Sequence, residues 1–208
     1  MKKLFLVFAA AALYCTAAHA VTIAFWSFNT GGVSVDEGAG TLVQATGAGA
    51  ESWPAGTPYT TSISNYVAGS ALSRASASWG TGSQSTRFYE MRVNASALSA
   101  LSLRFDASRS GTGPTRVDLY YSTDGGSSYA LFSSLTQPSA WTVFSFAGLS
   151  SISGLNNNSD VRFRLCPMSA SGSAGTIRFD NMLVEALPEP GLLVGLLGCA
   201  VLLLPRVR

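Results

Sequence analysis

The sequence predicts an all-β fold, an antiparallel β-sandwich of jelly-roll type, followed by a separate short apolar helix at the C-terminal end. Three observations lead to this prediction. Serine, threonine, glycine and alanine dominate the middle of the chain, where helical periodicity is hard to find. Short runs of β-branched and aromatic residues recur there between turn residues. Several runs alternate apolar and polar side chains, as strands with one face on a core do.

Eight runs are long enough to be strands, which is the number expected for a sandwich or jelly roll. In chain order they are Thr22 to Phe28, Thr86 to Val93, Leu101 to Ala107, Thr115 to Ser122, Tyr129 to Ser133, Thr142 to Ala147, Val161 to Cys166 and Thr176 to Glu185. Residues 30–85 are expected to form long loops that close one edge or end of the sandwich. Short strands are expected there near Thr41 to Ala45 and Ala71 to Ala77.

Alternation in three of these runs places arginines on the faces that point away from the core. The apolar residues Leu101, Leu103 and Phe105 alternate with polar ones, and the runs from 161 and 176 repeat this pattern. The outward arginines are Arg104, Arg162, Arg164 and Arg178. They either line a polar concave face or form a solvated outer face paired with neighbouring acids.

The first twenty residues have the plan of a secretory signal peptide. Lys2 and Lys3 precede an apolar run, and Ala18 and Ala20 supply the small residues that signal peptidase accepts, so that the mature chain begins at Val21. The alternative is a lipoprotein signal at Cys15, but the bulky Tyr14 before that cysteine argues against it.

Residues 187–208 have a three-part order. Pro188, Glu189 and Pro190 precede fourteen uncharged residues, Gly191 to Leu204, and the chain ends with Arg206 and Arg208 as a basic anchor. A helix of that length reaches about 21 Å, short of the roughly 30 Å hydrocarbon core. It therefore suits transient insertion in the inner membrane, with the arginines on the cytoplasmic side.

This order resembles the PEP-CTERM sorting signal of Gram-negative bacteria. The resemblance implies an exosortase, a membrane cysteine protease, that cuts at the Pro-Glu-Pro motif and passes the protein to the outer surface or extracellular matrix. The partners are then signal peptidase and exosortase during export. An ordinary single-span anchor is the alternative.

The 170 residues from 21 to 190 allow one domain, predicted over residues 21–186. They contain no lysine and no histidine, and nine arginines face eleven acids, a net charge of −2. Nucleic-acid binding therefore has little electrostatic support. Cys166 is the only cysteine in this segment, so no disulfide forms within it, and we expect a small buried hydrophobe there.

Two motifs resemble known structural elements. Residues 122–129, Ser-Thr-Asp-Gly-Gly-Ser-Ser-Tyr, resemble an Asp-box hairpin, in which Asp124 accepts backbone N–H bonds and Tyr129 packs beneath the turn. Residues 175–185 resemble the last strand of galactose-binding-like jelly rolls. That second resemblance implies that Asp180 ligates a structural calcium, with Asn181 or Asp106 contributing, or that it caps a bulge. No other cofactor is expected.

Most catalytic partners are missing from the sequence. The absence of histidine from residues 21–190 excludes a Ser-His-Asp triad, a Cys-His pair and histidine metal sites there. No catalytic residue is predicted, although a glycosidase needs only two carboxylates, and Glu51, Glu90, Asp106 and Asp118 are the candidates. Trp26 is expected in the core. Four aromatic residues in loops are candidates for a ligand patch: Trp53, Tyr59, Tyr66 and Trp79.

Two functions are compatible with these features. The first is a non-enzymatic surface or matrix protein that binds or structures extracellular polysaccharide, with the ligand inferred from the resemblance. The second is a secreted carbohydrate-active enzyme, which requires two carboxylates about 5 to 10 Å apart in a cleft.

Overall fold

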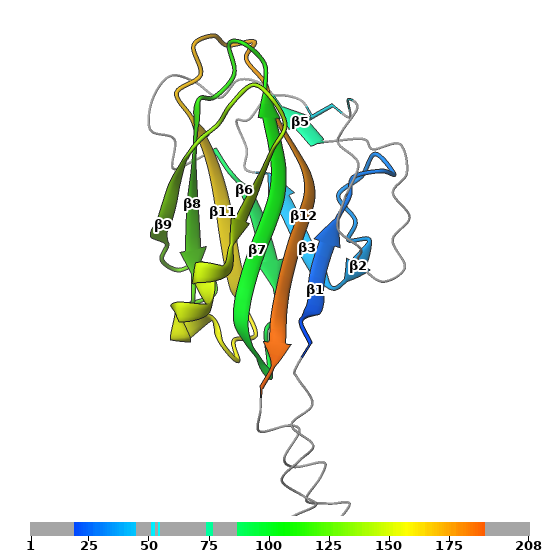
Figure 1. Cartoon of the computed structure of the whole chain (residues 1–208), viewed down its shortest axis with the longest axis vertical. Helices are drawn as coiled ribbons and strands as arrows, with labels where there is room; N and C mark the ends of the chain where they lie inside the picture. The colour runs from blue at the N-terminus through cyan, green and yellow to red at the C-terminus, as the bar shows by residue number, and fades with distance from the viewer. Residues whose placement is uncertain (1–18, 45–50, 53, 55–73, 77–86, 190–208) are drawn as a thin grey trace, which may run out of the picture.

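The computed structural model describes residues 19–44, 51–52, 54, 74–76 and 87–189. Their strands form two antiparallel sheets packed face to face (Figure 1). The seven-stranded sheet has the order β10-β7-β12-β1-β2. In the same sheet, β5 pairs with β12, and β4 pairs with β5. The five-stranded sheet has the order β3-β6-β11-β8-β9. This arrangement confirms the predicted all-β sandwich, whereas the predicted C-terminal helix lies outside the described residues.

All eight predicted strands are present, with ends shifted by a few residues. The seven-stranded sheet contains β1 (Val21–Trp26), β2 (Glu37–Gly38), β4 (Glu51–Ser52), β5 (Arg74–Ser76), β7 (Leu98–Arg109), β10 (Thr142–Phe146) and β12 (Ile177–Pro188). The five-stranded sheet contains β3 (Gly40–Gln44), β6 (Tyr89–Val93), β8 (Arg116–Ser122), β9 (Ala130–Thr136) and β11 (Val161–Met168). Two short 3₁₀ helices, η1 (Ala147–Ser151) and η2 (Ser153–Leu155), follow β10. The short strands expected within residues 30–85 correspond to β3 and β5.

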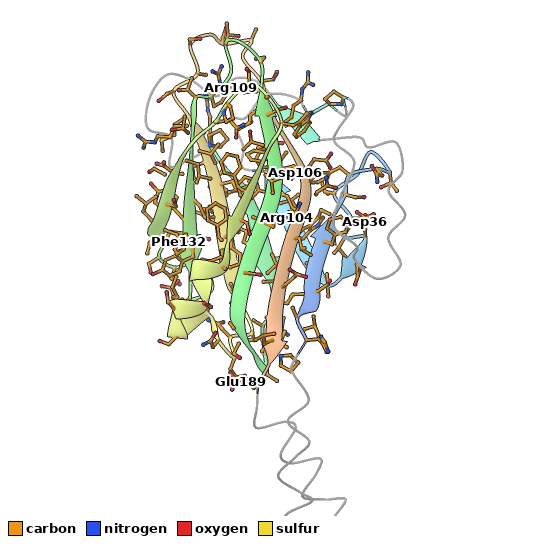
Figure 2. The ribbon with its side chains drawn as sticks, viewed as in Figure 1. Asp36, Arg104, Asp106, Arg109, Phe132 and Glu189 are labelled. Atoms are coloured by element: carbon orange, nitrogen blue, oxygen red, sulfur yellow. The ribbon has the colours of Figure 1, made fainter. Side chains whose placement is uncertain are left out.

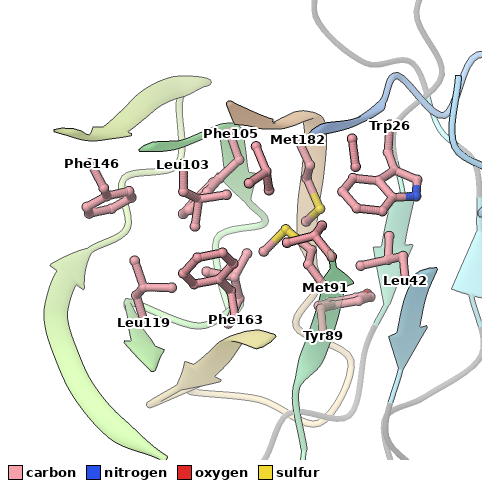
Figure 3. Close-up of a cluster of buried hydrophobic side chains, with 14 of the residues drawn as sticks. Trp26, Leu42, Tyr89, Met91, Leu103, Phe105, Leu119, Phe146, Phe163 and Met182 are labelled. Carbon is pink, nitrogen blue, oxygen red and sulfur yellow. The ribbon is translucent and has the colours of Figure 1, made fainter. Parts of the chain in front are cut away.

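The core fills the space between the two sheets with aliphatic and aromatic side chains (Figure 3). Leu101, Leu103 and Phe105 all point into it and are at most 1 % exposed, as their alternation predicts. Trp26 is fully buried there too. The Trp26 side chain is therefore part of the core, as expected.

A β-bulge in β12 resets the alternation. Asp180 pairs with Asp106, but the next pair is Leu183 with Arg104, so β12 carries one extra residue. Asn181 has a positive φ of 48° at this point. The extra residue turns Met182 into the core, where strict alternation after Phe179 would have placed Asn181.

The first and last strands lie side by side in the seven-stranded sheet. Val21 pairs with Ala186, so the start of β1 and the end of β12 leave the sandwich at the same end (Figure 1). The predicted N-terminal signal and C-terminal tail are therefore attached at one end. The turns 110–115 and 137–141 lie at the opposite end.

Among the described residues, no helix combines the length and apolarity needed to cross a bilayer.

Candidate functional site

The outer face of the five-stranded sheet carries a network of charged and aromatic side chains. Strand pairing aligns Glu90 of β6, Arg164 of β11 and Tyr120 of β8 in one row, and Arg92, Arg162 and Ser122 in the next. We call these six residues, with Tyr129, the arginine face. Successive side chains on a strand point to opposite faces of the sheet, and the positions next to these residues point into the core. Alternate residues of three paired strands therefore form this surface.

Glu90 is the centre of the arginine face, and its side chain is fully buried. Its Oε1 accepts a 2.6 Å hydrogen bond from Nε of Arg92. Its Oε2 accepts bonds of 2.6 Å from Nε of Arg164 and from the Tyr129 hydroxyl. Nη1 of Arg162 lies 3.6 Å from Oε1 of Glu90. Burial opposes ionisation, but the bonds from Tyr129, Arg164 and Arg92 outweigh it and hold the pKa of Glu90 below its usual 4.5.

Arg164 lies between two aromatic rings as well as beside Glu90. Its guanidinium carbon is 3.5 Å from the centroid of the Tyr129 ring and 3.9 Å from that of Phe88. Cation–π contacts of this kind, in a partly desolvated site, hold the guanidinium plane in place. The arginine face is therefore a preorganised surface.

The hairpin that supplies Tyr129 has the predicted Asp-box geometry. Asp124 accepts hydrogen bonds from the Ser128 N–H at 3.0 Å and from the Ser128 hydroxyl at 2.6 Å. These bonds and one from Ser122 hold the pKa of Asp124 well below its usual range. Gly125 and Gly126 take positive φ angles of 66° and 88°. The hairpin is thus a structural element, which positions Tyr129 on the sheet.

A pocket of about 300 Å³ opens beside the arginine face, at the end of the sheet from which the termini leave. It is shallow, and its lining comes from the adjoining ends of β3, β6 and β11: Ala39, Gly40, Thr41, Arg92, Val93, Asn94, Ser159 and Asp160. The Arg92 and Asp160 side chains are 43 % and 46 % exposed, so both reach solvent. A hydrogen bond from Arg162 lowers the pKa of Asp160, which keeps it ionised. Most of the accessible pocket surface is apolar, and Arg92 and Asp160 add a charged donor and a charged acceptor to it.

The predicted calcium residues lie on the other sheet. Asp106 and Asp180 are direct cross-strand neighbours, and both are nearly or fully buried. The side-chain amide of Asn181 donates to Oδ2 of Asp106 at 2.8 Å, whereas Oδ1 of Asp106 is buried without a partner. Burial raises the pKa of Asp106. Among the described residues, no group of three or more Asp, Glu, His or Cys side chains forms a metal cluster.

The four predicted outward arginines do not form one ladder. Arg162 and Arg164 belong to the five-stranded sheet, whereas Arg104 and Arg178 belong to the other. Arg162 donates two hydrogen bonds to Asp160, at 3.0 and 2.8 Å. The alternative of an outer face paired with neighbouring acids therefore holds for Arg162 and Arg164, because both contact acidic side chains.

Several predicted site residues lie outside the described residues. They are Trp53, Tyr59, Tyr66, Trp79, Ala18, Pro190, Arg206 and Arg208. Ala20, Val21, Pro188 and Glu189 are described; Pro188 is the last residue of β12, and Glu189 follows it. Cys166 is buried as expected, but it lies opposite Asp118 on the outer side of the sheet, and burial raises its pKa to about 12.

Three of the four candidate catalytic carboxylates have described side chains, and they do not converge. Glu90 is enclosed by arginines, Asp118 forms a 2.7 Å ion pair with Arg116, and Asp106 belongs to the other sheet.

The pocket residues Thr41, Asn94 and Ser159 were not predicted. The alternation of Glu90 and Arg92 with apolar residues in 89–93 could have indicated that these two side chains also point away from the core.

No protein-family model matches the chain, and no curated protein matches it in sequence. Solved structures with a similar fold do exist. The structure of an exo-beta-agarase is 14 % identical with a TM-score of 0.51, over 82 % of this chain and 25 % of that one. The chain thus spans a quarter of the agarase, and the likeness supports the β-sandwich fold.

Two shorter structures are also similar. One is the family 11 carbohydrate-binding module of the cellulosomal cellulase Lic26A-Cel5E of Clostridium thermocellum, 13 % identical over 83 % of this chain and 96 % of that one, with a TM-score of 0.42. The other is a CBM4 structure, 13 % identical over 78 % of this chain and 84 % of that one, with a TM-score of 0.41.

Proposed function

We propose that this chain is an exported, non-enzymatic module that binds extracellular polysaccharide at the pocket beside the arginine face. The pocket carries the proposal. Most of its accessible surface is apolar, which suits the C–H faces of a sugar ring. Arg92 and Asp160, with the hydroxyl of Thr41 and the amide of Asn94, offer hydrogen-bonding groups for sugar hydroxyls. Its volume is at the small end of ligand pockets, and its shallow shape lets a longer chain continue past it.

Replacing Arg92 should weaken binding to polysaccharide extracted from the producing cells. We expect Arg92→Ala in the mature protein to raise the Kd about tenfold to a hundredfold, because a charged hydrogen-bond donor is lost. Affinity electrophoresis or calorimetry measures this change. Thr41→Phe should have a similar effect, because Thr41 lines the pocket and is not a hydrogen-bond partner of Glu90.

Arg116→Ala is the matched control for this experiment. Arg116 lies on the same sheet, pairs with Asp118 and is 49 % exposed, but it does not line the pocket. If the Arg92 and Thr41 variants bind as tightly as the Arg116 variant, the pocket is not the binding site. If the mature protein binds no polysaccharide, the proposed function itself is wrong.

The carbohydrate-active enzyme is the weaker alternative. A glycosidase needs two carboxylates facing one cleft at about 5 to 10 Å. Glu90 forms an ion pair with Arg164, and Asp118 forms one with Arg116. Neither carboxylate lines the pocket. Release of reducing ends from the polysaccharide by purified mature protein would contradict the non-enzymatic proposal.

We also propose that the tail sorts the protein to the cell surface or the exopolysaccharide matrix of a biofilm, through an exosortase-type system. The three-part tail and the signal peptide of the sequence support this. Intact mass spectrometry of membrane, surface and medium fractions should find a mature chain that begins at Val21 and lacks Arg208. A chain that retains Arg208 in the inner membrane would mean a simple anchor.

A structural calcium between Asp106 and Asp180 is a further part of the proposal. The buried, unpartnered Oδ1 of Asp106 lies beside Asp180 of the neighbouring strand, and carboxylate oxygens are the ligands that a hard cation prefers. Chelation should lower the Tm by about 2 to 4 °C for each kcal/mol of binding energy lost. The Asp106→Asn variant should no longer respond to calcium, and an unchanged Tm of the wild-type protein on chelation would exclude the site.

A further inference from the structure

The last strand continues into the predicted sorting motif without a spacer. Leu187 pairs with Ser99, and Pro188 pairs with Leu98. Beyond the strand, the backbone N–H of Glu189 donates a 3.0 Å hydrogen bond to the carbonyl oxygen of Ala97. Glu189 lies at the end of the sandwich where β12 leaves it (Figure 2). The sheet therefore holds the backbone as far as Glu189.

The partner segment of this contact is itself fixed by the loop after η2. Ala97 has a positive φ of 60°, which alanine rarely adopts without support. Its N–H donates to Oδ1 of Asn157 at 2.8 Å, and the N–H of Asn157 donates to the Leu98 carbonyl at 2.7 Å. Asn157 is thus a positioning residue, because it holds the carbonyl that anchors Glu189.

Sheet pairing of this kind restricts proteolysis. A protease binds its substrate as an extended strand through backbone hydrogen bonds. Leu187 and Pro188 are paired with β7, and the N–H of Glu189 is bonded to Ala97, so cleavage among these residues requires the end of the sheet to open first.

Resting on the proposed sorting function, we propose that the folded sandwich fixes the cleavage point on the C-terminal side of Glu189. In the cleavage step, the peptide C–N bond after Glu189 or a later residue breaks. Water adds its hydroxyl to that carbonyl carbon, and its proton goes to the departing amine. The peptide bond between Pro188 and Glu189 stays intact, and the released domain keeps its full last strand.

The C-terminal residue of the processed chain tests the proposal directly. Intact mass spectrometry of protein from the native cells should give a last residue at Glu189 or later, and a product that ends at Leu187 or Pro188 overturns the proposal. Inserting Gly-Ser-Gly-Ser between Leu187 and Pro188 moves the motif off the sheet. In this variant the bonds before Glu189 should also be cut, because the sheet no longer protects them. A linker variant whose products all still end at Glu189 or later contradicts the proposal, because the sheet then does not decide the cleavage point.

Hydrogen exchange tests the anchor without the protease. In the mature full-length chain in detergent, the Glu189 amide should exchange roughly tenfold more slowly than in a chain carrying the inserted linker. Asn157→Gly should remove most of this protection, since glycine accepts the positive φ of 49° and only the side chain is lost. Asn158→Gly is the control, because the Asn158 amide bonds to Thr123 and Gly154 instead.

The outcomes separate the two proposals. If every fraction retains Arg208, the sorting proposal fails, and the exchange of Glu189 alone decides whether the anchor exists. If the chain is processed but the Glu189 amide exchanges freely, sorting stands and the cleavage-point proposal is wrong.

Discussion

Glu90→Gln should lower the free energy of unfolding of the mature protein by about 3 to 5 kcal/mol at neutral pH. The reason is that Glu90 is fully buried and is the shared acceptor for Arg92, Arg164 and the Tyr129 hydroxyl. Glutamine keeps the shape but leaves the arginines without their common counter-charge. Urea denaturation followed by tryptophan fluorescence measures the loss.

The same network predicts a pH dependence. The pKa of Glu90 is lower in the folded protein than its usual 4.5, so its contribution is complete above about pH 4.5 and is lost as the pH falls through the folded pKa. The wild-type protein should therefore lose stability below that pH, and the difference between it and Glu90→Gln should shrink.

Glu185→Gln provides the matched control for both measurements. Burial raises the pKa of Glu185, so removing its charge at neutral pH should cost no stability. A loss below about 1 kcal/mol in Glu90→Gln would show that the arginines find other partners.

Phe105→Ala should cost about 3 to 5 kcal/mol, the second large effect. Phe105 is fully buried, and its ring centroid lies 5.4 Å from that of Phe144, 5.8 Å from that of Phe146 and 5.7 Å from that of Phe179. Truncation removes these contacts and leaves a cavity between the sheets. Denaturant midpoints of the two proteins, converted with a common slope, give the difference.

The control for Phe105 is an apolar residue on the adjacent edge strand. Val143 is 53 % exposed on β10, so Val143→Ala should change stability by no more than about 0.5 kcal/mol. Equal losses in the two variants would mean that β7 and β10 unfold together before the core opens.

Alternation predicted the core well because it is a local property of the chain. In 101–105 and 161–165, each apolar residue is followed by a polar one, and all six apolar side chains are at most 1 % exposed. The two-residue strands β2 and β4 were not predicted, since two residues show no period. The bulge at Asn181 was an open alternative, and the structure places it there.

The pocket could not be predicted in the same way. Its lining combines residues 39–41, 92–94 and 159–160, which are far apart in the sequence and meet only when β3, β6 and β11 pair. The positive φ angles of Ala97 and Ala100 were equally hidden, because alanine avoids that region unless tertiary contacts support it. Those contacts come from Asn156 and Asn157, more than fifty residues later.

The fold class, the core faces, the Asp-box hairpin and the absence of histidine from residues 21–190 could therefore be inferred from the sequence. These features depend on local periodicity, on turn residues and on the number of residues of each type. The tertiary structure alone decided that Glu90 is the centre of the arginine face, that a pocket lies beside it and that Glu189 is tied to Ala97. Each of these depends on which strands become neighbours, and strand pairing joins residues whose distance along the chain leaves no local pattern.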